Sequence, residues 1–127
     1  RQRTPPIQQS VLISYLGNDA ERHKKYLEMF KARGNELIDQ IGNFVKQQER
    51  ENIKNFAHQF KSMSKSVGAM PLHDSTLEME NLALSADMAD LEALFNRILK
   101  QFNEVIAFIK DNYSPLESPL STSVNTG

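Results

Sequence analysis

Residues 57–69 carry the stretch AHQFKSMSKSVGA, which decides how this chain folds. At about 100° per residue, its apolar positions and those just before it fall on one arc of a helix. That arc, which we expect to face a core, holds Ile53, Phe56, Ala57, Phe60, Ser64 and Val67. Gly68 suits the position just after the helix, where a left-handed backbone favours glycine. The stretch therefore predicts a helix from about Arg50 to Val67 with one buried face.

Amphipathic helices are also predicted before and after this one, because apolar residues recur three and four positions apart. They cover about Gln8–Leu16, Ala20–Gln47, Met70–Leu84 and Met88–Asn112. Gly17 ends the first of them, and Asn18 or Asp19 can cap the next. Gly34 falls on the apolar stripe of its helix, where it would allow a close helix approach. The expected fold class is all-α, an antiparallel up-down four-helix bundle with a short additional N-terminal helix.

The composition is that of one ordinary globular domain: 127 residues, 39% of them hydrophobic and 24% charged, with a net charge of −1. We expect a linker over residues 1–6, a folded domain over 7–113, and a disordered Ser/Thr/Pro-rich tail over 114–127. The near-neutral charge argues against nucleic-acid binding. The chain has no cysteine, which excludes disulfides and thiolate metal sites and fits a cytoplasmic location.

No apolar run approaches the roughly 20 residues that a membrane span needs, and no signal peptide is visible. We therefore expect no direct contact with a membrane. A monomer is also expected, because the core of the bundle accounts for the long apolar stripes.

His58 lies roughly 160° from the centre of the apolar arc, where a side chain points at water. Lys54, Lys61, Ser62 and Lys65 surround it on the outward face. The lysine charges disfavour the imidazolium form, so they keep the ring neutral and nucleophilic, and they would attract a phosphoryl group. A solvated charged face that holds a histidine by chance is the competing interpretation. We favour a chemical role for His58, since serine at position 62 leaves the ring accessible.

The other two histidines are predicted to be surface residues. His23 lies among charged neighbours, and His73 opens a helix near the rim of the outward face. No pair of histidines has the spacing of metal ligands, so we expect no metal site.

Several motifs together resemble the histidine-containing phosphotransfer (HPt) domain of bacterial and fungal phosphorelays. They are Ala57-His58, Phe60-Lys61, Gly68-Ala69, Leu72 and Met79-Glu80, in the order and spacing of the family, and Tyr15–Asp19 is similar to its entry segment. The resemblance covers about Ile7–Tyr113. The chain departs from the family pattern at Ser62, where glycine is usual, and at Phe60, where leucine is usual.

The resemblance implies that His58 accepts a phosphoryl group from the aspartyl phosphate of one receiver domain and passes it to another. It implies that Lys61 stabilises the phosphoryl oxygens and that Glu80 orients the imidazole by accepting the Nδ1–H bond. The turn Gly68-Ala69 is the structural motif of the family. The candidates for docking the receiver are Ser62, Met63, Lys65, Ile13 and Leu16.

The sequence holds no Gly-rich phosphate loop and no carboxylate constellation for Mg²⁺, so we expect no cofactor. The response-regulator receiver partner would have to supply the magnesium. The domain alone is accordingly expected to be a phosphocarrier and not an enzyme.

Three functions remain open at this stage. The first is a phosphorelay carrier, which the missing initiator Met and the linker favour as the C-terminal module of a hybrid sensor kinase, itself anchored in the inner membrane. The second is the N-terminal phosphorylation domain of a chemotaxis-type kinase. The third is a non-catalytic helical adaptor, against which the intact His58 and Lys61 argue.

Overall fold

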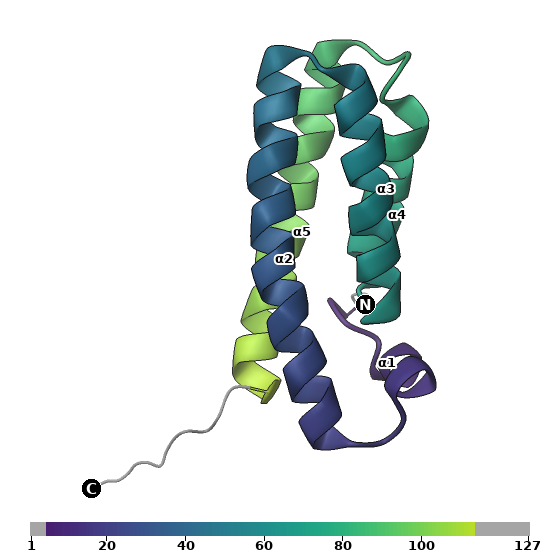
Figure 1. The fold of residues 1–127 in the computed structure, drawn as a ribbon, viewed down its shortest axis with the longest axis vertical. Coiled ribbons are helices and arrows are strands. Elements are labelled where there is room, and N and C mark those ends of the chain that lie inside the picture. The colour runs from purple at the N-terminus through teal and green to yellow at the C-terminus, as the bar shows by residue number, and fades with distance from the viewer. Residues whose placement is uncertain (1–4, 114–127) are drawn as a thin grey trace, which may run out of the picture.

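The computed structural model of the protein describes residues 5–113, and the predicted tail and most of the predicted linker lie outside the described residues. The described part is built from helices (Figure 1). In chain order they are α1 (Gln9–Leu16), α2 (Ala20–Gln47), α3 (Arg50–Ser66), α4 (Met70–Leu82) and α5 (Met88–Tyr113). No strand interrupts them between residues 5 and 113.

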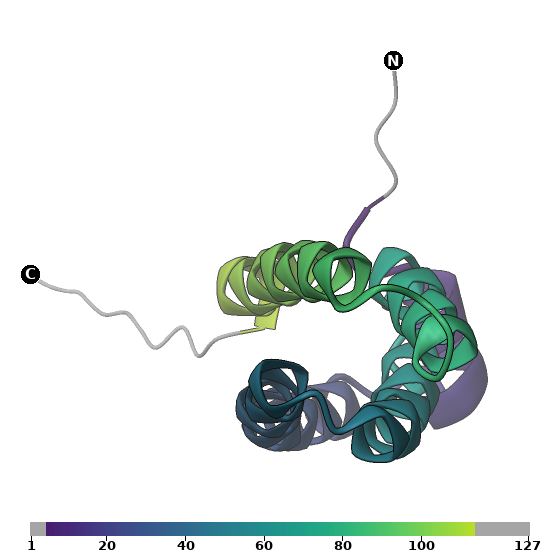
Figure 2. The ribbon, with the colours of Figure 1, turned by 90° about the horizontal axis from the view of Figure 1, so that it is seen from above.

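The helices α2 to α5 form an antiparallel up-down bundle, in which each runs opposite to the one before it (Figure 1). Seen from above, α3 and α5 both neighbour α2, and α4 lies between α3 and α5 (Figure 2). The short helix α1 contacts α2 and α3 at the end of the bundle where α3 finishes. The all-α fold class and the additional N-terminal helix are therefore confirmed.

Two helices end earlier than the periodicity indicates. The helix α3 ends at Ser66, because Gly68 takes a left-handed backbone with φ 78° and its N–H bonds to the carbonyl of Lys65. The helix α4 ends at Leu82 instead of Leu84. Beyond it the guanidinium of Arg50 donates to the carbonyl of Ala83, the residue that follows the last helical position, and to that of Ala86 in the loop before α5. The sequence pattern could not reveal this clamp from another helix.

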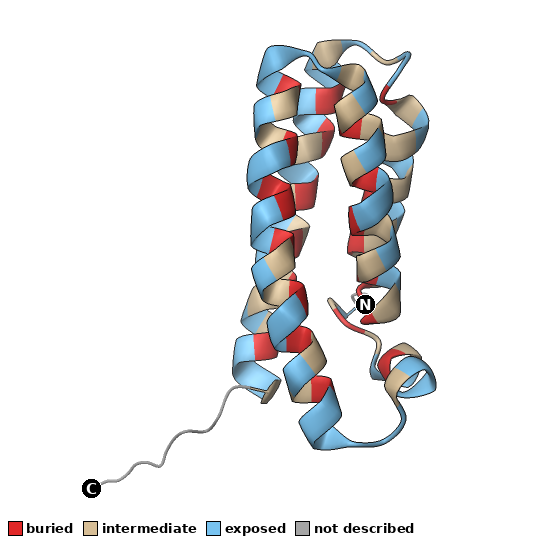
Figure 3. Ribbon diagram, viewed as in Figure 1, coloured by how far each residue is buried: buried red, intermediate tan, exposed pale blue. Residues whose placement is uncertain are grey.

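The core is centred on three phenylalanines, Phe30, Phe60 and Phe102, from three different helices. Their ring centroids lie 5.7 to 6.4 Å apart in tilted or edge-to-face arrangements, which suit the aromatic quadrupole. The buried positions line the inner faces of the bundle, as Figure 3 shows. Because Phe60 fixes the inward side of α3, the residues two positions before and after it turn toward solvent.

The helices α2 and α5 approach each other at glycines. A Cβ atom at Gly34 would lie 2.4 Å from Phe102, and one at Gly42 would lie 3.0 Å from Phe95. Each phenylalanine thus occupies the space that a side chain on α2 would need, as expected for Gly34. None of the helices within residues 5–113 has the length and apolar character that crossing a membrane requires.

Candidate functional site

His58 projects from the middle of α3 into solvent. Its side chain is 58% exposed, whereas its neighbour Ala57 and the nearby Phe60 are fully buried. Within this turn of α3, Ala57 and Phe60 face the core and His58 faces solvent, as the sequence pattern predicts. The ring is reachable by another protein.

The His58 ring is held by a carboxylate from the next helix. Its Nδ1 atom lies 2.7 Å from Oε2 of Glu80, which α4 presents beside α3 through the hairpin that Gly68 closes. An ionised carboxylate only accepts hydrogen bonds, so Nδ1 is the protonated nitrogen and donates. In the neutral ring this leaves Nε2 with a free lone pair, and no hydrogen-bond partner occupies it among the described residues.

Lys61 completes the cluster by pairing with the other oxygen of the same carboxylate. Its Nζ lies 2.8 Å from Glu80 Oε1, and both side chains are about four-fifths buried. Oε1 has no hydrogen bond of good geometry within residues 5–113, so this contact is an ion pair at close range. The Lys61 ammonium, helped by the His58 ring, holds the pKa of the Glu80 carboxyl below its ordinary value of 4.5, although burial opposes the shift.

The lowered pKa of Glu80 makes part of the stability of the fold depend on pH. The ionised carboxylate stabilises the folded state above pH 4.5, and this contribution disappears as the pH falls through the lower folded-state pKa. We expect Glu80→Gln to reduce the free energy of unfolding near pH 7 by up to about 1 kcal/mol. The difference between variant and wild type should shrink toward pH 3 in urea titrations, and a difference that grows with acidity would contradict this account.

The candidate docking residues spread from His58 toward α1. Ser62 and Lys65 are exposed, and Met63 is half-buried. On α1, which contacts α3, Ile13 is exposed and Leu16 is half-buried. The structure therefore leaves these side chains at the surface along one end of the bundle. Gly68 and Ala69, by contrast, are buried in the turn between α3 and α4.

An apolar surface next to Met63 escaped the sequence analysis. Met29 of α2 is 60% exposed, and with Tyr26, Phe30, Arg33 and Met63 it lines a shallow hollow between α2 and α3. The sequence does show a methionine on each helix, Met29 on α2 and Met63 on α3. Recognising them as one surface requires knowing that α2 and α3 pack side by side, which a single sequence does not reveal.

The prediction that His23 is a surface residue is wrong. Its side chain is buried, and its Nε2–H donates to the carbonyl of Gly17 at 2.6 Å. The ring thereby fastens the turn between α1 and α2, a tertiary contact that its charged sequence neighbours conceal. His73 is also less exposed than expected, since only 17% of its side chain meets solvent and Nδ1 lies 3.1 Å from Asp74.

No group of three or more histidine, cysteine or carboxylate side chains in the described part of the chain could hold a metal ion. What the cluster of His58, Glu80 and Lys61 offers is a nucleophilic ring nitrogen beside an ammonium group.

Comparison with known proteins places the chain in a family. The sequence model of the Hpt domain matches residues 25–108, about two-thirds of the chain. The chain therefore belongs to the Hpt domain family, whose members are histidine phosphocarriers of phosphorelays, not catalytic enzymes, and interact with response-regulator receiver domains.

The fold is also similar to a crystal structure of histidine-containing phosphotransfer protein B (HptB) from Pseudomonas aeruginosa PAO1. The TM-score is 0.76 at 21% sequence identity, over 86% of this chain and 96% of that one. No curated protein sequence matches the chain.

Proposed function

We propose that this chain is a relay carrier that accepts a phosphoryl group on His58 from a receiver aspartyl phosphate and passes it to the aspartate of a second receiver. The observation that supports this most directly is the exposed imidazole whose Nδ1–H is committed to Glu80. That bond leaves Nε2 as the nucleophile and fixes the direction of its lone pair.

In the proposed transfer, a bond forms between Nε2 and phosphorus while the bond from phosphorus to the aspartate oxygen breaks. The aspartate leaves as a carboxylate, and the ring acquires positive charge that the Glu80 carboxylate at Nδ1 stabilises. Passing the group to the second receiver is the reverse of this step. Each phosphoryl group therefore moves without hydrolysis and without a proton being released to solvent.

Lys61 is proposed to stabilise the phosphoryl oxygens as a point charge. Its ammonium now lies against Glu80 Oε1, on the same carboxylate that binds the ring, so it is within reach of a group attached to Nε2. We further propose that Ser62, Met63 and Lys65, together with Ile13 and Leu16 on α1, contact the receiver. No resident cofactor is needed if the receiver brings its own magnesium.

The test is to incubate the protein with a receiver domain carrying radiolabelled aspartyl phosphate, without nucleotide. Label is expected on this chain in a form that acid removes and alkali preserves, as for phosphohistidine. Adding a second, unphosphorylated receiver should then remove the label. A chain that acquires label only from a kinase domain with ATP would contradict receiver-to-receiver transfer.

Glu80→Ala is predicted to change both the ring and the reaction. Without the acceptor at Nδ1, the ring loses its fixed tautomer, so the proton distributes between both nitrogens. The nitrogen-15 shifts of His58 should report this change, and phosphoryl uptake should slow by roughly tenfold.

The matched control is Glu78→Ala, which removes a carboxylate on the same helix that pairs with Arg97 and not with His58. It should leave the His58 tautomer and the uptake rate unchanged. Unaltered nitrogen shifts in Glu80→Ala would remove the orienting role that we give to Glu80.

A further inference from the structure

His23 is a buried polar residue to which the proposed phosphoryl transfer gives no role. It lies in the first turn of α2, it is only 7% exposed, and its Nε2 atom lies 2.6 Å from the carbonyl oxygen of Gly17. A carbonyl oxygen only accepts hydrogen bonds, so Nε2 carries the proton and donates it. Breaking this bond would leave a buried donor unpaired, which costs free energy. The ring therefore holds the turn between α1 and α2 against the start of α2.

The backbone of the same turn is also hydrogen-bonded on both sides. The N–H of His23 donates to the carbonyl of Asp19 at 3.0 Å, and the side chain of Asp19 caps α2. Gly17 takes a left-handed backbone with φ 76°, and its N–H donates to the carbonyl of Ile13 at 2.7 Å. Gly17 thus donates to α1 and accepts from the His23 ring, so the end of α1 is linked to α2 through this one residue.

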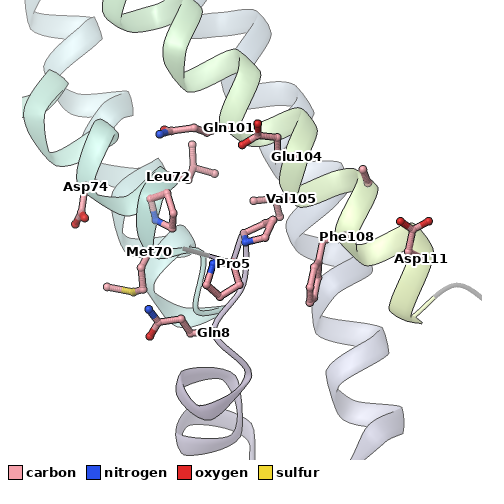
Figure 4. A pocket seen from close by; sticks show the side chains of 13 residues that line it. Pro5, Gln8, Met70, Leu72, Asp74, Gln101, Glu104, Val105, Phe108 and Asp111 are labelled. Atoms are coloured by element: carbon pink, nitrogen blue, oxygen red, sulfur yellow. The ribbon is translucent and has the colours of Figure 1, made fainter. Parts of the chain in front are cut away.

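The helix α1 depends on attachments of this kind for its position. It has eight residues, fewer than the roughly 12 that even a favourable isolated helix needs in water, and no side chain caps its start. Before it, Ile7 is buried and the N–H of Gln8 donates to the carbonyl of Gly68 at 2.8 Å. Figure 4 shows Gln8 just before α1, at the lower end of the cleft between α4 and α5. The start of α1 is therefore fixed by this segment, its middle by the fully buried Leu12, and its end by the His23 ring.

The part of α2 that carries His23 is itself bound to α3. About one turn further along α2, the hydroxyl of Tyr26 lies 3.0 Å from the Oγ atom of Ser66, the last residue of α3. Because α2 is fixed to α3 at this end of the bundle, a ring that fixes α1 to α2 also fixes α1 relative to α3. His23 thereby determines where the exposed Ile13 of α1 lies relative to Met63 of α3.

We infer that His23 is a positioning residue for receiver binding: it holds α1 in the orientation in which the docking residues of α1 and α3 form one surface. The inference rests on the proposed function, because it assumes that α1 contacts the receiver. It adds a determinant of affinity that lies beneath the proposed docking surface and touches neither the receiver nor the phosphoryl group. A displaced α1 should weaken receiver binding, whereas the reaction at His58 in the middle of α3 should keep its limiting rate.

The test compares two substitutions of His23. His23→Leu removes the donor and keeps an apolar side chain of moderate size, whereas the amide nitrogen of His23→Gln can replace Nε2 as the donor. Label uptake is measured against increasing concentrations of a receiver that carries radiolabelled aspartyl phosphate. In His23→Leu the half-saturating receiver concentration should rise by about three- to tenfold, the factor that one hydrogen bond commonly represents. The limiting rate should stay unchanged, and His23→Gln should recover most of the loss.

A second measurement follows the turn without any receiver. Amide hydrogen exchange at Gly17, whose N–H bonds to the last turn of α1, should be faster in His23→Leu than in wild type or His23→Gln. Phosphoramidate, a small donor that needs no docking surface, should label all three proteins at the same rate. Circular dichroism verifies the fold. If His23→Leu does not fold, His23→Asn replaces it, because its shorter amide cannot reach the Gly17 carbonyl.

The matched control is His73→Leu. It removes another histidine of low exposure, but from α4, whereas α1 contacts α2 and α3. The half-saturating receiver concentration and the exchange at Gly17 should both stay at their wild-type values.

An unchanged half-saturating concentration in His23→Leu overturns the inference, even if exchange at Gly17 is faster. Unchanged exchange at Gly17 overturns it as well, since the ring would then not hold the turn. A lower limiting rate that phosphoramidate labelling shares would also overturn it, because the residue would then act on the reaction and not on docking. The proposed function fails in a different way, namely when the wild-type chain takes no label from a phosphorylated receiver.

Discussion

His58→Gln is expected to abolish phosphoryl uptake from a phosphorylated receiver, with a loss of more than about 1,000-fold. The reason is chemical: an amide nitrogen has no available lone pair, so no bond to phosphorus can form. The side chain is 58% exposed, and exposed substitutions of this kind usually change stability by less than about 0.5 kcal/mol. The fold should therefore survive, as circular dichroism and the thermal midpoint can verify.

The matched control for this experiment is His73→Gln. Like His58, this histidine lies beside a carboxylate, here that of Asp74, but little of it is exposed. Its replacement should leave the labelling unchanged. Acid-labile label that persists in His58→Gln would place the phosphoryl group on another residue and refute the assignment.

Gly34→Ala is expected to destabilise the fold by about 2 kcal/mol. The new Cβ atom would meet Phe102 at 2.4 Å, and that ring is buried and packed against Phe30 and Phe60, so moving it would disturb the core. A contact this short places the cost of overpacking near the upper end of its usual range, about 3 kcal/mol, which exceeds by about 2 kcal/mol the gain of about 1 kcal/mol when alanine replaces glycine in a helix. Urea unfolding should show the loss, and the thermal midpoint should fall by about 10 °C.

Gly42→Ala provides the comparison on the same helix. Its Cβ would lie 3.0 Å from the outer edge of Phe95, which is only half-buried and can shift by a few tenths of an ångström. The helix-propensity gain should then balance or exceed the packing cost, so stability should change little or rise. If both alanine variants lose the same stability, the cost would come from something other than contact with the phenylalanines.

The helices were predictable because their signals are local. Apolar residues that recur three and four positions apart mark α2, α3 and α5. Asp19, one of the two residues expected to cap α2, does so by accepting hydrogen bonds from the backbone N–H groups of Glu21 and Arg22. The end of α4 was not predictable, since the acceptors beyond it are satisfied by Arg50, 33 and 36 residues away. No local pattern carries that information.

The candidate site also has a part that local sequence patterns predict and a part that they do not. Periodicity alone places His58 on the outward face of α3, but only the resemblance to a family connected it with Glu80, 22 residues further along. Neither source showed that Lys61 pairs with the same carboxylate. For His23, charged neighbours in sequence suggested a wet surface, whereas the α1–α2 turn folds over it and takes its hydrogen bond.

The uninterrupted course of α3 from Arg50 to Ser66 has a kinetic consequence. The His58 ring projects from a continuous helix whose inner face is packed against the core, so the proposed phosphoryl transfer would need no rearrangement of α3 before a donor arrives. We therefore expect the rate of phosphoryl transfer to be limited by diffusional encounter with the receiver, so it should fall as solvent viscosity rises. The rate should also depend on ionic strength, because lysines surround the ring.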